Sequence, residues 1–154
     1  MAKRAAFEEN ARLLREALGI VPLLYGSLGL EVRTGLALGA DDIDVLIPAV
    51  HLGAGWDRFR RTLEAHGYTL IDEREHEFMR DGIAYAYAPI EDLADFAGVR
   101  EEDIPLLAGC RLMTLAQYLQ VYRASAKDGY RVEVRGKKDG EKIALIEKLL
   151  AEEA

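Results

Sequence analysis

The hydrophobic positions along the chain follow two periods, and these periods predict the secondary structure. Where apolar residues recur every three or four positions, as at Trp56, Phe59 and Leu63, the pattern is typical of an amphipathic helix. Short apolar runs bounded by glycine, proline or aspartate predict buried strands. The predicted helices cover 3–18, 28–34, 56–66, 90–96, 114 to about 127 and a last stretch from about 138. The predicted strands cover 20–25, 43–47, 68–71, 75–80 and 83–88.

Turn and cap residues refine this order of elements. Asp81-Gly82 is a strong hairpin signal between two predicted strands, and Gly109 indicates a minor hairpin within 106–112. Thr114 with Gln117 forms a capping box at the start of a helix, and a basic loop follows over about 128–137. Helices therefore bracket a mixed β-sheet. We expect an α+β fold in a single domain over 1–154, with a C-terminal helical segment from about 114.

Composition narrows the class of protein. At 154 residues, half of them hydrophobic, the chain is long enough to bury a core of ordinary globular kind. The net charge of −7 argues against nucleic acid or an anionic membrane as the main partner. The single cysteine, Cys110, fits a reducing compartment, and no apolar stretch reaches transmembrane length. We expect a soluble cytoplasmic protein.

The segment from 23 to 46 carries the residues with the clearest chemistry. An apolar run ends in Gly26-Ser27, where glycine lets the chain turn and bring backbone N–H groups close to anionic oxygens. Asp42 and Asp44 alternate with apolar residues, so both carboxylates are predicted on one face of a strand, with Cα atoms ~6.5–7 Å apart. Two such carboxylates suit a divalent cation. The alternative for Gly26-Ser27 is a plain strand-to-helix turn with Ser27 as its cap.

The order of apolar strand, Gly-Ser, helix and Asp-hydrophobic-Asp resembles the nucleotidyltransferase superfamily, and the longer spacing closed by Gly35 is similar to its lincosamide and aminoglycoside branch. The resemblance implies a nucleotidyltransferase-like fold and metal-dependent transfer of a nucleotidyl group from an NTP to a hydroxyl of a small-molecule or protein acceptor. Asp42 and Asp44 would then bind Mg²⁺ or Mn²⁺ as the catalytic pair, and Gly26 and Ser27 would hold phosphates.

The chain departs from the family pattern at one strand. Family members carry a third carboxylate on a later strand, and the corresponding segment here, 83–88, contains no acid. A base for the acceptor hydroxyl would have to come from Glu75 or Glu77, on the neighbouring predicted strand, or from Asp81 at the hairpin tip. The solvent-facing side of an ordinary strand explains Glu75 and Glu77 equally well.

The basic residues form one concentration near the C-terminus, at Arg131, Arg135, Lys137, Lys138 and Lys142. The resemblance places lysines of this region near the nucleotide, so Lys138 and Lys142 are the predicted triphosphate ligands; a solvated loop and helix start is the alternative. Two further functions stay open. The first is that of a catalytically reduced protein of the same fold, which binds nucleotide or serves as a partner subunit. The second is that of an interaction domain without a ligand.

Overall fold

A computed structural model of the chain describes residues 2–127 and 129–153, except for the side chains of 129–139. The chain divides into two compact units, one formed by 1–91 with 106–112 and the other by 92–105 with 113–154. Each unit is described by itself below. The expectation of one domain over 1–154 stays a prediction.

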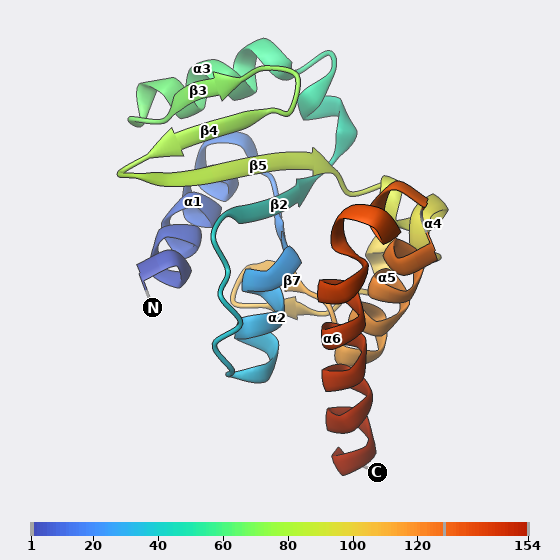
Figure 1. The fold of residues 1–154 in the computed structure, drawn as a ribbon. Helices are drawn as coiled ribbons and strands as arrows, with labels where there is room; N and C mark the ends of the chain where they lie inside the picture. Colours follow the sequence, from blue (N-terminus) through green and yellow to red (C-terminus); the bar gives the residue numbers. More distant parts are fainter. Residues whose placement is uncertain (1, 128, 154) are drawn as a thin grey trace. The chain divides into compact units, whose positions relative to one another are not determined.

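A seven-stranded mixed sheet forms the centre of the first unit, in the order β3-β4-β5-β2-β1-β7-β6 (Figure 1). Two neighbouring pairs are parallel, β1 with β7 and β2 with β5, and the other four are antiparallel. The strands are β1 Leu23–Tyr25, β2 Ile43–Ile47, β3 Thr69–Asp72, β4 Glu77–Arg80, β5 Ile83–Pro89, β6 Leu106–Leu107 and β7 Cys110–Leu112. This sheet with its flanking helices confirms the predicted α+β class.

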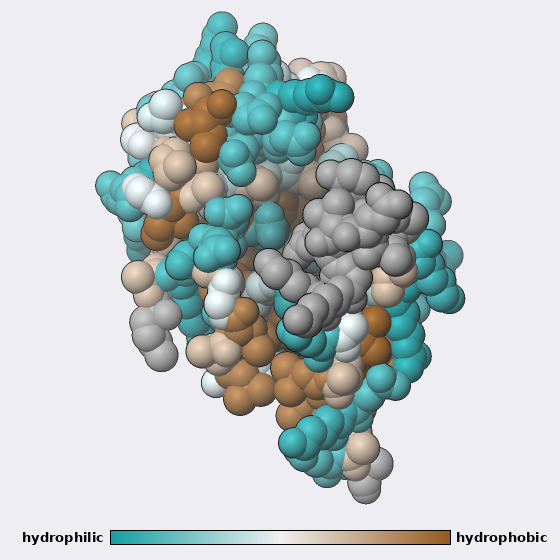
Figure 2. Space-filling model, viewed as in Figure 1, coloured by the Kyte–Doolittle hydropathy of each residue, from teal (hydrophilic) through white to brown (hydrophobic). Residues whose placement is uncertain are grey.

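One face of the sheet packs into a hydrophobic core. Alternate strand residues such as Val45, Tyr85 and Tyr87 are fully buried there, because side chains along a strand point to the two faces in turn. Buried side chains of α1 (Ala2–Leu18) and α3 (Trp56–Ala65) complete this core. The outer surface of α3, β3 and β4 is mostly hydrophilic in Figure 2, as expected for an amphipathic helix lying on a sheet.

Local turn chemistry explains the connections around the sheet. Asp81 and Gly82 both have positive φ, 51° and 77°, which a two-residue hairpin turn requires, and Ala108 and Gly109 do the same between β6 and β7. Both predicted hairpins are confirmed. Helix α2 (Gly26–Thr34) ends at Gly35 in the left-handed conformation, also as predicted, and a short helical turn, η1 (Ala49–Leu52), follows β2.

The second unit is helical, with α4 (Asp92–Ala97), η2 (Glu101–Asp103), α5 (Leu115–Lys127) and α6 (Gly129–Glu153). The capping box is confirmed: the Gln117 N–H donates to the Thr114 hydroxyl at 3.1 Å, and the Thr114 N–H donates to the Gln117 side chain at 3.0 Å. The prediction of a basic loop before about 138 is wrong, because α6 already begins at Gly129. Glycine within a helix costs only about 1 kcal/mol relative to alanine, and packing between α5 and α6 offsets such a cost.

Among the helices of residues 2–127 and 129–153, none combines the length and the apolar character that crossing a membrane requires.

Candidate functional site

The turn between β1 and α2 lies directly against Asp44. Gly26 opens α2 with a φ of +64°, and a Cβ atom added to it would lie 2.6 Å from Oδ2 of Asp44. Any side chain at this position would therefore clash with the carboxylate, in addition to the strain of a positive φ. The structure thus brings together two of the predicted residues, Gly26 and Asp44, that stand far apart in the sequence.

The register of β1 and β2 explains why Gly26 lies against Asp44. Tyr25, the last residue of β1, pairs with Asp44 of the antiparallel β2, so the turn that follows β1 is placed beside the Asp44 side chain. Ile43 and Val45 are fully buried in the core, while Asp44 between them is half-buried on the opposite face. Ser27 is half-buried in the first turn of α2, where backbone N–H groups and the helix dipole favour an anion.

Asp42 is exposed and lies one residue before β2 begins. The prediction that its carboxylate shares a face with that of Asp44 rests on the spacing of two residues and stays a prediction. The phosphate-binding role of Gly26 and Ser27 is likewise a prediction.

A row of three paired residues extends from Asp44 across the sheet. Asp44 pairs with Ala86 of the parallel strand β5, and Ala86 pairs with Glu77 of the antiparallel strand β4. Residues paired across neighbouring strands point to the same face. Glu77, Ala86 and Asp44 therefore share the face that lies away from the core, with the small alanine in the middle.

The electrostatic surroundings of Glu77 are acidic. Partial burial raises the pKa of the Glu77 carboxyl, and the negative charges of Asp42, Asp72 and Glu75 raise it further. Asp42 is thus within electrostatic reach of Glu77. Within the part of the chain that the structure describes, the Glu77 carboxylate makes no hydrogen bond or ion pair that would offset this repulsion.

The other two acids considered as substitute bases lie elsewhere. The prediction that Glu75 belongs to the strand is wrong, because 73–76 form a turn and β4 begins at Glu77. Glu75 is exposed in that turn, where its N–H is bonded to the Asp72 carboxylate at 3.2 Å. Asp81 is exposed at the tip of the hairpin. Of the three acids, only Glu77 lies in the row that contains Asp44.

The residues at the turn fit a divalent cation. Asp42 and Asp44 supply hard carboxylate oxygens, and the missing Cβ of Gly26 lets the Asp44 carboxylate lie directly against the backbone of the turn. No group of three His, Cys, Asp or Glu side chains arranged to hold a metal occurs among the described residues. Mg²⁺ does not require such a cage, since it is usually bound through one or two carboxylates, with phosphate and water oxygens completing its shell.

The two predicted lysine ligands belong to the second unit. Lys142 of α6 places its Nζ 5.3 Å from the ring centroid of Tyr122, a cation–π contact within that unit. Tyr122 is itself buried and stacked on Tyr118, which agrees with a packing role for these rings. The side chain of Lys138 lies outside the described residues. A role of either lysine at a triphosphate stays a prediction.

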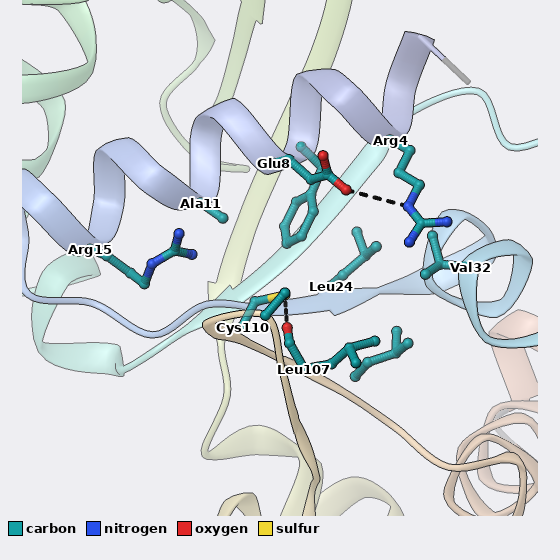
Figure 3. Close-up of a pocket in the computed structure, with 11 residues that line it drawn as sticks. Arg4, Glu8, Ala11, Arg15, Leu24, Val32, Leu107 and Cys110 are labelled. Atoms are coloured by element: carbon teal, nitrogen blue, oxygen red, sulfur yellow. Dashed lines mark hydrogen bonds and ion pairs between the residues drawn. The ribbon is translucent and has the colours of Figure 1, made fainter.

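A separate pocket of about 310 Å³ lies in the first unit, between α1, β1, α2 and the β6–β7 hairpin (Figure 3). Arg4 and Glu8 pair at 3.4 Å at one side of it, and the Cys110 thiol donates to the Leu107 carbonyl at 3.1 Å. Burial raises the pKa of this thiol, so it is mainly protonated and a poor nucleophile. Leu24, which lines the pocket, faces the core side of the sheet, so the pocket is not part of the Asp44 site.

Comparison with known proteins gives two matches. The uncharacterized protein YnaI of Bacillus subtilis (strain 168) is 40% identical over 148 residues, which cover 94% of this chain and 95% of that protein. Among solved structures, the solution structure of the antibiotic-resistance factor ANT(2'')-Ia matches with a TM-score of 0.54 and 13% identity, over 97% of this chain and 94% of that one. No model of a known protein family matches. The structural match supports the predicted nucleotidyltransferase-like fold.

Proposed function

The chain belongs to the family of the Bacillus subtilis protein YnaI, and we propose that it transfers a nucleotidyl group from a nucleoside triphosphate to a hydroxyl group of a small molecule or protein. The observation that carries the proposal is the contact of the Gly26 turn with Asp44, in a fold like that of a nucleotidyltransferase. A glycine turn at a helix start binds phosphate, and a carboxylate beside it suits a cation that accompanies phosphate.

In this proposal, backbone N–H groups at the start of α2 and the Ser27 hydroxyl orient the terminal phosphates. Asp42 and Asp44 hold Mg²⁺ or Mn²⁺, which when bound neutralises negative charge on the triphosphate. In the proposed reaction, binding at α2 would orient the triphosphate so that the acceptor hydroxyl attacks the α-phosphorus in line, and such orientation is the main contribution a protein makes to phosphoryl-type transfer. Lys138 and Lys142 are proposed as further triphosphate ligands.

A second candidate function is nucleotide binding without turnover. The observation that favours it is Ala86, which occupies the β5 position beside Asp44, on the strand where the resemblance leads us to expect an acid. Such a protein would bind NTP and a divalent cation through the same residues. It would release no pyrophosphate.

Calorimetric titration with ATP, in the presence of Mg²⁺ or Mn²⁺ and in their absence, tests the binding step common to both functions. We expect metal-dependent binding by the wild type and a loss of affinity of at least about tenfold in Asp44→Asn. Asp57→Asn is the matched control, because Asp57 is an exposed acid in the first turn of α3, and its affinity should equal that of the wild type. If the wild type binds none of the four common NTPs with either metal, both functions are rejected.

Pyrophosphate release separates the two functions. The assay uses the four common NTPs and an acceptor panel of aminoglycosides, lincosamides and hydroxyl-bearing peptides. Release that depends on the acceptor supports transfer. ATP binding without release for any acceptor supports the binding protein.

A further inference from the structure

Glu77 on β4 is a half-buried acid of the first unit whose carboxylate, among the described residues, makes no hydrogen bond or ion pair. We infer that Glu77 is the catalytic base for the acceptor hydroxyl, reaching across Ala86 from the strand next to the one where the family resemblance leads us to expect an acid. This inference rests on the proposed transfer function and adds to it the residue that takes the proton.

The position of Glu77 follows from strand register. Neighbouring strands lie about 4.8 Å apart, so Glu77 and Asp44 are separated by about twice that distance, with Ala86 between them. An acid on β5 at position 86 would stand one strand from Asp44. Glutamate on the next strand has the longer side chain, and it projects on the same face of the sheet.

The strand between them leaves this path open. Ala84, Ala86 and Ala88 occupy the face of β5 that points away from the core, while Tyr85 and Tyr87 are buried on the other face. A methyl group at position 86 is the smallest side chain that still belongs to a regular strand. Nothing in the β5 sequence on this face stands between a glutamate on β4 and a substrate held near Asp44.

The structure favours a base over a metal ligand for Glu77. No three acids among the described residues are close enough together to form a metal cage, so Glu77 does not join Asp42 and Asp44 in one. Its carboxylate is half-buried and, among those residues, bonded to no cation or N–H group that would occupy its oxygens. A carboxylate oxygen with that freedom is available to accept a proton.

The reaction step balances with this assignment. The acceptor oxygen forms a bond to the α-phosphorus, and the bond from the α-phosphorus to the oxygen that bridges it to the β-phosphorus breaks. That electron pair leaves with pyrophosphate. The hydroxyl proton goes to the Glu77 carboxylate, and from there to water after the product has left.

The first test replaces the acid and measures both binding and turnover. We expect Glu77→Gln to lower acceptor-dependent pyrophosphate release by about 10²–10⁴-fold. The dissociation constant for ATP with Mn²⁺, measured by calorimetry, should stay within about threefold of the wild type. Asp57→Asn, at an exposed acid in the first turn of α3, is the control and should change neither quantity.

The second test moves the acid along the row. In Glu77→Gln combined with Ala86→Asp, a carboxylate stands on β5 beside Asp44, and pyrophosphate release should recover by at least about tenfold over Glu77→Gln alone. A residue with a purely structural role would not be replaced by an acid on another strand. Recovery would therefore identify the proton acceptor.

The outcomes distinguish this inference from the proposed function. If the wild type binds none of the four common NTPs, both are overturned. If the wild type turns over and Glu77→Gln is equally active, only the base assignment is overturned. It is also overturned if Glu77→Gln loses metal-dependent ATP binding, which would make Glu77 a ligand, or if the wild type binds ATP and transfers to no acceptor.

Discussion

Gly26→Ala is the most direct probe of the turn against Asp44. The new Cβ would lie 2.6 Å from Oδ2, and real contacts of this kind essentially never fall below 3.0 Å, so the carboxylate or the backbone must move by at least the difference, 0.4 Å. Holding alanine at a left-handed φ costs about 1–2 kcal/mol, and forcing a side chain off its preferred rotamer costs about 0.5–1.5 kcal/mol. We expect Gly26→Ala to lower the free energy of unfolding by about 1.5–3.5 kcal/mol.

Gly35→Ala separates the two contributions. Gly35 ends the same helix at a φ of +75°, and a Cβ there would meet nothing within 4 Å. Its substitution should cost only the backbone part, about 1–2 kcal/mol. Urea unfolding followed by circular dichroism at pH 7 without ligand measures the free energy of unfolding for both variants.

A double-mutant cycle then assigns the excess cost to the carboxylate. The Cβ of Asp44 is 3.4 Å from the added methyl group, an ordinary contact, so in an Asp44→Ala background the clash disappears. Gly26→Ala should then cost no more than Gly35→Ala. Equal costs for the two glycine substitutions in the wild-type background would refute the contact and, with it, the site built on it.

Three further predictions concern packing, capping and charge. Tyr87→Phe removes the hydroxyl that accepts a buried 2.7 Å hydrogen bond from the Asn10 amide, and should lower the free energy of urea unfolding by about 1–3 kcal/mol. Thr114→Ala deletes one half of the capping box with Gln117 and should lower the unfolding free energy by about 0.5–2 kcal/mol, whereas Thr62→Ala, at an exposed hydroxyl within α3, should cost less. The raised pKa of the Glu77 carboxyl means that folding disfavours its ionised form. The resulting loss of folding stability is absent at pH values below the pKa of this group in the unfolded chain, and it grows as the pH rises through its pKa in the folded chain. Glu77→Gln should therefore be more stable than the wild type at pH 8, with the advantage lost at pH 3; equal stability of the two at pH 8 would contradict the acidic environment.

Local rules predict most elements because each has its signal within a few residues. Strand β2 follows from an apolar run that stops at Pro48, and the β4–β5 hairpin from Asp81-Gly82. The same rules miss the start of α6, since Gly136 and the charges around it indicate a loop when only neighbouring residues are considered. The partner helix that stabilises α6 is α5, and no local pattern contains that packing.

Local sequence patterns do not predict which strands pair when the strands are distant along the chain. The local pattern predicts a strand over 20–25 but not its neighbours, and the structure has β1 at Leu23–Tyr25, inside the sheet between β2 and β7. The β7 strand reaches this place from far along the chain, and the Arg111 N–H donates to the Pro22 carbonyl at 2.8 Å. No turn joins these strands, so only tertiary packing selects the neighbour.

The sequence indicates Gly26 and Asp44 separately, and only the antiparallel register of β1 and β2 shows why they touch. Taken alone, Gly26 is explained by a plain strand-to-helix turn, and Asp44 by an acid on the side of a strand that lies away from the core. Gly26, however, must lack a Cβ because the carboxylate of Asp44, on another strand, lies against it, and neither separate explanation accounts for that contact. The functional interpretation gains support from the pair, not from either residue.

The pairing of Glu77 with Ala86 can be deduced from the sequence alone. A two-residue turn at Asp81-Gly82 pairs Arg80 with Ile83, and counting outward from the turn along the antiparallel strands pairs Glu77 with Ala86. The second pairing, Ala86 with Asp44, joins parallel strands that no short turn connects. No local feature of the sequence therefore fixes the register of these two strands.

The core settles that register. A slip of one residue would turn Tyr85 and Tyr87 out of the aromatic core and place one of them beside Asp44. Both rings are almost completely buried, with edge-to-face contacts to Tyr68, Phe59 and Phe78, so such a slip would expose the largest side chains of the strand. The same packing that buries the tyrosines therefore turns the alanines of β5 outward and leaves Glu77 facing Asp44 across them.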